Sequence, residues 1–167
     1  GEYITFVDSD DYLTPDAIAV MLEPATATDA DVVIANMFYK DEKMKVAVAE
    51  HLYTGADIKS VIINHMMGNY AKKEDAFSYT ATAKLFKKKL FTENNLSFPS
   101  ERKLIWEDLA FSVEAYPLCE KVYVLHKPIY YYCFNEGSLT HTYKPNKLEL
   151  VMELYHYMGV KIQKLNL

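Results

Sequence analysis

The most constraining feature of this sequence is an apolar run, Tyr3 to Val7, that ends in three carboxylates within four residues: Asp8, Asp10 and Asp11. β-Branched and aromatic residues in such a run predict a buried strand. Carboxylates this close repel each other, and burying them without partners would cost several kcal/mol. We therefore expect them at the end of a strand, where open α/β sheets bind their ligands.

Carboxylate oxygens are the ligands that Mg²⁺ and Mn²⁺ prefer, and such a metal commonly serves a phosphate or diphosphate group. The same stretch also permits a plainer interpretation. Thr14 and Pro15 follow the acidic cluster and predict a polar turn into a helix, with Thr14 as N-cap and Pro15 at the first helical position. A turn at a strand end is where a metal site would be built, so the two interpretations are compatible.

Length and composition indicate one globular domain with a substantial core. The chain has 167 residues, 50% of them hydrophobic, and a formal net charge of −5. Its basic residues are scattered apart from Lys84 and residues 87–89, so we expect no nucleic-acid binding. No apolar run is long enough to span a bilayer, and no signal peptide is visible. Cys119 and Cys133 lack metal-ligand spacing and predict buried thiols in a reducing cytoplasm.

Hydrophobic periodicity predicts strands and helices along the rest of the chain. We expect strands over residues 31–39, 45–49, 121–125 and 128–134, and helices over residues 15–23, 54–63, 87–94, 106–116 and about 145–167. Pro24 should end the first helix, and Thr54 should cap the second. Residues 68–77 have no clean period and predict a loop, whereas the last helix carries an amphipathic stripe.

A second acidic pair, Glu107 and Asp108, stands at the start of the helix predicted over residues 106–116. A helix dipole favours negative charge there by up to about 1 kcal/mol, so such a pair alone is more often a cap than a catalyst. Trp106 directly precedes it and would provide an apolar wall, which raises the pKa of a carboxyl and suits a general base. Since group transfer at the first cluster would need a base, the pair is a candidate catalytic site.

Four blocks of sequence, in this order, resemble inverting family 2 glycosyltransferases of the GT-A fold. They are residues 1–15 with the Asp-x-Asp motif at Asp8 and Asp10, the segment 83–87, the Glu-Asp motif within 106–111, and the tyrosine-rich strand 128–132 with the Gly-Ser turn that follows it. Together they extend over about 140 residues. A match of this length is far more specific than Asp-x-Asp alone.

The resemblance implies an α/β fold, namely the C-terminal half of a GT-A (nucleotide-diphospho-sugar transferase) domain with a mixed sheet and packed helices. The N-terminal nucleotide-binding half of such enzymes would precede Gly1, so residues 1–167 would form a single truncated domain with little or no activity alone. Removing the neighbours of the strand at residues 3–7 would bare its edge, and we therefore expect the fragment to self-associate.

The resemblance also implies an activity, which is metal-dependent inverting transfer of a sugar from a nucleotide-sugar donor to a hydroxyl of a carbohydrate or lipid-linked acceptor. Asp10, helped by Asp8, would bind Mn²⁺ or Mg²⁺, and Asp11 would be structural or would contact the donor diphosphate. Asp108 would be the catalytic base, and Glu107 would orient the acceptor or Asp108.

Two further positions complete this expectation and one departs from it. Trp106 would contact the acceptor, and His141 would be a late ligand for the metal or the diphosphate, although a lone histidine in a turn is more often solvated. Related sequences often have arginine where this chain has Cys133, so any diphosphate contact there is lost or comes from another group. The expected setting is cell-surface polysaccharide biosynthesis in the cytoplasm, either free or peripheral at the inner face of the cell membrane.

Two alternatives stay open. A haloacid-dehalogenase-like phosphatase also places Asp-x-Asp after a hydrophobic strand, with Asp8 as nucleophile and Asp10 as acid/base, but Tyr12 stands where that family has a small Thr or Val. A non-enzymatic, tyrosine-rich binding or assembly module would use the acidic stretch only as a turn. The 14 tyrosines suit carbohydrate stacking and buried strands equally well.

Overall fold

The computed structural model describes residues 1–40, 42–44, 46, 48–66, 79–100, 104–133 and 145–165. Within these residues, the strands form one mixed sheet in the order β1-β6-β3-β7-β2, with β4 paired to β3 and β5 paired to β7. The strands are β1 (Tyr3–Ile4), β2 (Tyr12–Leu13), β3 (Val32–Tyr39), β4 (Glu42–Lys43), β5 (His51–Thr54), β6 (Lys84–Lys87) and β7 (Lys121–Tyr132). β3 and β7 run parallel, and β1 pairs antiparallel with β6 at one edge.

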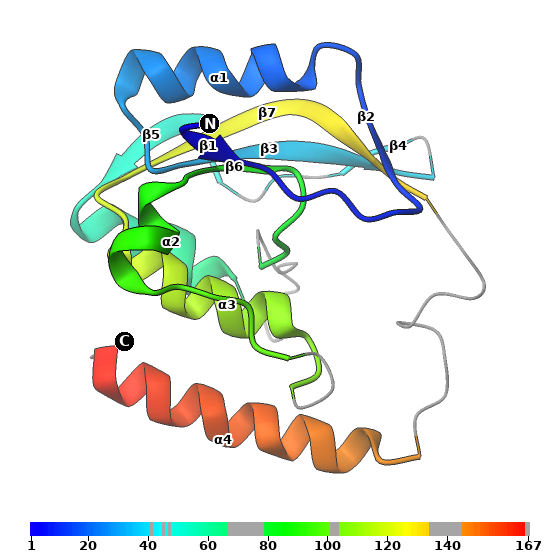
Figure 1. Cartoon of the computed structure of the whole chain (residues 1–167), viewed down its shortest axis with the longest axis vertical. Helices are drawn as coiled ribbons and strands as arrows, with labels where there is room; N and C mark the ends of the chain where they lie inside the picture. Colours follow the sequence, from blue (N-terminus) through cyan, green and yellow to red (C-terminus); the bar gives the residue numbers. More distant parts are fainter. Residues whose placement is uncertain are drawn as a thin grey trace.

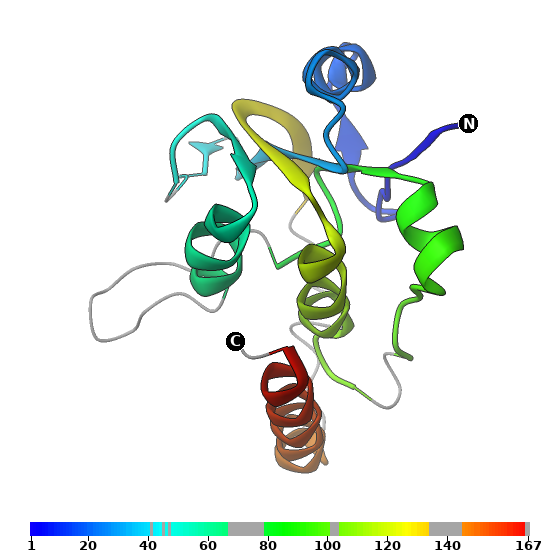
Figure 2. The same ribbon diagram turned by 90° about the vertical axis from the view of Figure 1, so that its left-hand side faces the viewer.

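Helices cover both faces of this sheet. They are α1 (Ala17–Thr28), the π-helix η1 (Ile58–Ile63), α2 (Lys89–Asn94), α3 (Glu107–Ala115), the 3₁₀-helix η3 (Tyr116–Leu118) and α4 (Lys147–Leu165). α1 lies over one face, and α3 lies over the other with η1 and α2 on either side of it (Figures 1 and 2). α4 forms an outer layer against α3. No helix of the described residues is both long and apolar enough to cross a membrane.

The central strand β3 contributes to two cores, one on each face of the sheet. Val33 and Ala35 pack with the α1 side, whereas Val32 and Ile34 pack with the α3 side. Successive side chains of a strand point to opposite faces, so a strand that is covered on both faces needs a continuous apolar run. The strand predicted over residues 31–39 is therefore confirmed.

The two aromatic strands predicted over residues 121–125 and 128–134 are one long strand, β7. Its pairing with β3 shifts register between Ile34 and Asn36, where Val124 and Pro128 are the respective partners. The two additional residues of β7 form a bulge, which lets a proline lie within a paired strand. The helices predicted over residues 87–94 and 106–116 are confirmed by α2 and α3.

The expectation of a buried strand over residues 3–7 is wrong. β1 has only two residues, and the chain beyond it makes a single parallel bridge from Phe6 to Thr82. Val7 is 44% exposed. The apolar run lies at the edge of the sheet, with β6 beside it on one side only, so only part of it is covered.

The first helix also differs from its prediction at both ends. Its N-cap is Asp16, and the Thr14 hydroxyl donates a hydrogen bond to the Asp16 carboxylate at 2.8 Å instead of capping a helix N–H. Pro24 lies inside α1 and does not end it. Proline removes one helical hydrogen bond, but Met21 and Ala25 are fully buried against the sheet, and this packing offsets the loss.

Two smaller predictions are also revised. The strand that pairs with the end of β3 is β4 at residues 42–43, ahead of the return arm expected at residues 45–49, and residues 45 and 47 lie outside the described residues. Thr54 ends the unpredicted strand β5, and Asp57 is the N-cap of the helix that follows. The loop predicted at residues 68–77 lies outside the described residues.

Candidate active site

The acidic turn after β1 is held by the strand β7. The Asp11 N–H donates to the Asp8 carbonyl at 3.1 Å and closes the turn. The buried Tyr130 donates its hydroxyl to one carboxylate oxygen of Asp11 at 2.6 Å and accepts the Asp8 N–H at 3.1 Å. The Cys133 N–H donates to the other oxygen of Asp11 at 2.8 Å. Both carboxylate oxygens of Asp11 therefore accept hydrogen bonds from within the fold.

Asp8 and Asp10 lie on the exposed side of this turn. The pKa of Asp8 is raised above its ordinary value, first because the surrounding chain partly shields its carboxyl from water, and then because Asp11, Asp108 and Asp10 carry like charges nearby. The contribution of Asp108 shows that the two acidic motifs, distant in sequence, lie within electrostatic reach of each other.

An aromatic cluster connects the acidic turn to α3. Phe6, two residues before Asp8, packs edge-on against Phe98 with ring centroids 5.0 Å apart. Phe98 stacks on Phe111 of α3 at 4.0 Å, and Phe111 follows Asp108 by less than one turn. Aromatic pairs of this kind contribute about 0.5–1.5 kcal/mol beyond their buried area. The carboxylates of Asp8 and Asp108 are thus carried by segments anchored in one packed cluster.

α3 begins directly after Trp106, whose backbone is left-handed with a φ of 56°. This conformation costs an ordinary residue about 1–2 kcal/mol, and such strain is concentrated at functional sites. The Trp106 side chain is 47% exposed, so much of it is accessible to a ligand. Glu107 and Asp108 follow in the first turn of the helix and are half-buried.

The chain segment at residues 79–84 lies against Asp108. Burial raises the pKa of the Asp108 carboxyl, while a backbone hydrogen bond from Ala81 and the positive charge of Lys84 lower it. The Tyr79 carbonyl accepts a hydrogen bond from the Ser112 hydroxyl of α3 at 2.8 Å. The surroundings of Asp108 therefore include a backbone donor and a lysine, both from the same short segment.

Lys84 is a residue of this site for which the sequence predicted no role in sugar transfer. It is the first residue of β6, and it is only 2% exposed. Burial lowers the pKa of its ammonium to about 7, and the negative charge of Asp108 opposes this shift. The available signal was a lysine within the apolar stretch 83–86, although in the sequence it forms a dense basic cluster with residues 87–89.

The residues present fit a partial metal site. In the described part of the chain, no group of three or more His, Cys, Asp or Glu side chains is placed to hold a metal ion. Mg²⁺, however, is commonly held by one or two carboxylates together with water and substrate phosphates. The exposed carboxylates of Asp8 and Asp10 fit this coordination, since a cation would relieve their mutual repulsion. His141 lies outside the described residues.

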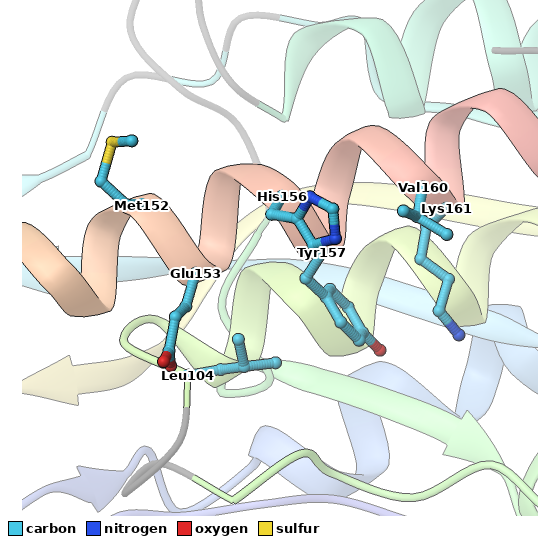
Figure 3. A pocket seen from close by; sticks show the side chains of 7 residues that line it. All are labelled: Leu104, Met152, Glu153, His156, Tyr157, Val160 and Lys161. Atoms are coloured by element: carbon cyan, nitrogen blue, oxygen red, sulfur yellow. The ribbon is translucent and has the colours of Figure 1, made fainter.

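A cavity of about 640 Å³ lies away from these motifs, between α4 and the segment before α3. Its lining is mainly apolar and consists of Leu104, Met152, Glu153, His156, Tyr157, Val160 and Lys161. Figure 3 shows these side chains along α4, with Leu104 on the neighbouring segment. The lining includes none of the predicted site residues, so this cavity is separate from the acidic motifs.

Known proteins resemble this chain in sequence and in fold. Residues 1–94 match the model of the family "Glycosyl transferase family 2". The Glycosyltransferase GlyG of Streptococcus pneumoniae serotype 4 is 32% identical over 85% of this chain and 47% of its own length. The Putative glycosyltransferase EpsH of Bacillus subtilis (strain 168) is 29% identical over 99% of this chain and 47% of its own length. The chain thus spans about half the length of these relatives.

The crystal structure of S. aureus TarS 1-349 in complex with UDP-GlcNAc superposes with a TM-score of 0.68 at 21% identity, covering 96% of this chain and 42% of that chain. This likeness confirms the predicted fold class, a portion of a GT-A domain with a curled mixed sheet. Because the matching family model covers more than half of its residues, the chain belongs to glycosyl transferase family 2.

Proposed function

We propose that this chain is part of a glycosyltransferase that moves a sugar from a nucleotide-sugar donor to an acceptor hydroxyl with inversion. The observation that supports this most directly is the electrostatic coupling of Asp8 and Asp108, whose segments share one aromatic cluster. The relatives are named glycosyltransferases, and the similar TarS structures contain UDP-GlcNAc or UDP. Residues outside this chain would then bind the nucleotide base.

Asp108 is the proposed catalytic base. It would take the proton of the acceptor hydroxyl while the acceptor oxygen forms a bond to the anomeric carbon of the donor. The bond from that carbon to the diphosphate oxygen breaks at the same time, and the nucleoside diphosphate leaves with the electron pair. Glu107 would orient the acceptor or Asp108, and the accessible indole of Trp106 would pack on the apolar face of an acceptor sugar.

Asp10 and Asp8 would hold Mn²⁺ or Mg²⁺, which when bound supplies positive charge to the leaving diphosphate. Asp11 would act differently, because its two oxygens accept hydrogen bonds from Tyr130 and Cys133. We propose that Asp11 maintains the shape of the turn and that the donor and metal contacts fall to Asp8 and Asp10. The acceptor, whether a carbohydrate or a lipid-linked sugar, and the cytoplasmic or membrane-peripheral location remain predictions.

The test is sugar transfer by the full-length protein that contains this chain. Removal of a general base lowers the rate by about 10²–10⁴-fold, and we expect such a loss for Asp108→Asn. Asp57→Asn is a matched control, because Asp57 is exposed and makes no side-chain cap to η1. Transfer at the wild-type rate by Asp108→Asn would overturn the assignment.

The same assay separates the alternatives. A non-enzymatic module would show no metal-dependent transfer and no loss in Asp10→Ala or Asp108→Asn. Membership of glycosyl transferase family 2 disfavours the phosphatase alternative, as does the antiparallel edge position of β1. Self-association of the isolated chain stays part of the proposal, since β1 lies at a sheet edge. Light scattering at high concentration checks it, and a strictly monomeric chain would contradict it.

A further inference from the structure

Lys84 has an unusual environment for a lysine. Its ammonium donates to the carbonyl of Thr80 and, at 3.4 Å, to the hydroxyl of Thr80 and the carbonyl of Thr82. Among the ion pairs within 4.0 Å between described residues, none involves Lys84. A buried ammonium whose contacts are uncharged needs compensation from a more distant negative charge, or it loses its proton.

The lysine holds a bent segment of backbone, residues 80–83. This bend curls so that the carbonyls of Thr80 and Thr82 face the ammonium. Ala83 lies in the left-handed region with a φ of 55°, a conformation that costs free energy for a residue with a side chain. The Ala83 carbonyl accepts the N–H of Ala35 in β3 at 2.9 Å. The bend is thus strained, and Lys84 and β3 hold it in place.

The bend lies between the two acidic motifs. Thr82 pairs with Phe6, which leads into the acidic turn. On the other side, Ala81 provides a backbone hydrogen bond to the Asp108 carboxyl, and the residue before the bend, Tyr79, accepts the Ser112 hydroxyl of α3. A shift of the bend would therefore move the acidic turn and Asp108 relative to each other.

We propose that Lys84 is a positioning residue of the active site, which fixes the bend at residues 80–83 and stabilises the Asp108 carboxylate with its buried positive charge. This inference rests on the proposed role of Asp108 as the base. Its chemical basis is that a base accepts a proton only in its ionised form, while burial favours the neutral acid. A cation that is itself sealed from water acts on its neighbour with little screening by salt.

The charges of Lys84 and Asp108 stabilise each other. Lys84 lowers the pKa of Asp108, and Asp108 raises the pKa of Lys84. Among the described residues, the other titratable groups near Asp108 include Asp8 from the acidic turn, Tyr79 before the bend and Glu107 in α3. Asp8 and Asp108 carry like charges, and the tyrosine is uncharged at neutral pH. Within the part of the chain that the structure describes, Lys84 is thus the cation that favours the Asp108 carboxylate.

The decisive variant is Lys84→Met, which keeps the length of the side chain and removes its charge. NMR of isotope-labelled aspartate, assigned with Asp108→Asn, should show the pKa of Asp108 moving upward in Lys84→Met. In the full-length protein, the acid limb of the kcat profile should move to higher pH, so the loss of kcat is larger at low pH than at high pH. Lys84→Arg should restore part of the wild-type profile because it retains the charge.

Lys87→Met is the matched control, since Lys87 is a second buried lysine of β6 whose partner is Asp29 at 2.6 Å. It should leave the titration of Asp108 and the shape of the pH profile unchanged. Equal effects of the two variants on the Asp108 titration, or an unchanged Asp108 titration in Lys84→Met, would overturn the proposal.

If Lys84→Met does not fold, the comparison of Lys84→Gln with Lys84→Arg makes the same distinction. If Asp108→Asn retains full transfer while the Lys84 variants still shift the Asp108 titration, the proposed function fails and the coupling stands.

Discussion

The hydroxyl of Tyr130 donates a hydrogen bond of 2.6 Å to the carboxylate of Asp11, a residue 119 positions earlier in the chain. The same hydroxyl oxygen accepts the N–H of Asp8 at 3.1 Å. Burial and the bond to Asp11 raise the pKa of Tyr130, so its hydroxyl stays protonated and able to donate. One buried side chain of β7 therefore attaches both ends of the acidic turn to the sheet.

Tyr130→Phe should loosen that turn. The variant leaves a carboxylate oxygen of Asp11 and the N–H of Asp8 without this partner, and an unsatisfied group of this kind costs about 1–3 kcal/mol. We expect a lower free energy of unfolding and, in the full-length protein, a higher KM for the donor. Tyr123→Phe, on the same strand, is the control. If urea unfolding and donor titration give both variants the same free energy of unfolding and the same KM, the Tyr130 hydroxyl has no special role.

Phe98→Leu should disturb the site through packing alone. The substitution keeps an apolar side chain but removes the ring that contacts both Phe6 and Phe111. Two aromatic pairs are lost, each worth about 0.5–1.5 kcal/mol. We expect a lower melting temperature and slower transfer with the pH profile unchanged. Phe38→Leu removes a ring that stacks on Tyr131 at 4.4 Å and makes no ring contact with Phe6, Phe98 or Phe111 among those between described residues, and it should affect stability more than transfer.

These relationships differ in how far the sequence predicts them. β3 is predictable because Val32 to Ala35 form a continuous apolar run, which is required of a strand covered on both faces. The run at residues 3–7 looks similar, but its burial depends on partners from distant parts of the chain, and β1 has only β6 beside it. Pro24 is misleading for the same reason, since packing on the sheet overrides a local helix breaker.

The sequence likewise predicts some residues of the candidate site and not others. The acidic motifs are visible as short patterns, and their proximity was expected only through the resemblance to a family. The contact from Tyr130 to Asp11 and the burial of Lys84 leave no local pattern, because each is created by strands that meet in the folded sheet. Sequence patterns therefore identified the carboxylates but not the side chains that hold them.

Metal binding by the chain should depend on Asp10. Binding of a cation to a carboxylate favours the ionised form and releases protons, and the raised pKa of Asp8 should fall when Mn²⁺ is added. Paramagnetic broadening of the NMR signals of the acidic turn measures this binding, and EDTA should reverse it. Asp10→Ala should abolish the broadening and Asp57→Asn should not. In the full-length protein, EDTA should stop transfer and Mn²⁺ should restore it. Retained broadening in Asp10→Ala would place the metal elsewhere.

The ionised carboxylate of Asp108 should reduce the stability of the fold. The pKa of Asp108 is raised in the folded chain, chiefly by burial, so the folded state binds its proton more tightly than the unfolded state does. Stability should therefore fall as pH rises from the ordinary pKa of an aspartate through the raised pKa of Asp108, and the deficit persists above it.

The variant Asp108→Asn tests this pH dependence, because it removes the charge and keeps an oxygen that can accept the Ala81 hydrogen bond. We expect it to increase the free energy of unfolding at neutral pH while it slows transfer as stated above, and the gain in stability should disappear in acid. Urea unfolding across this pH range measures the difference, with Asp57→Asn as the control. A loss of stability in Asp108→Asn at neutral pH would contradict the prediction, because it would mean that the ionised carboxylate contributes more to folding than its burial costs.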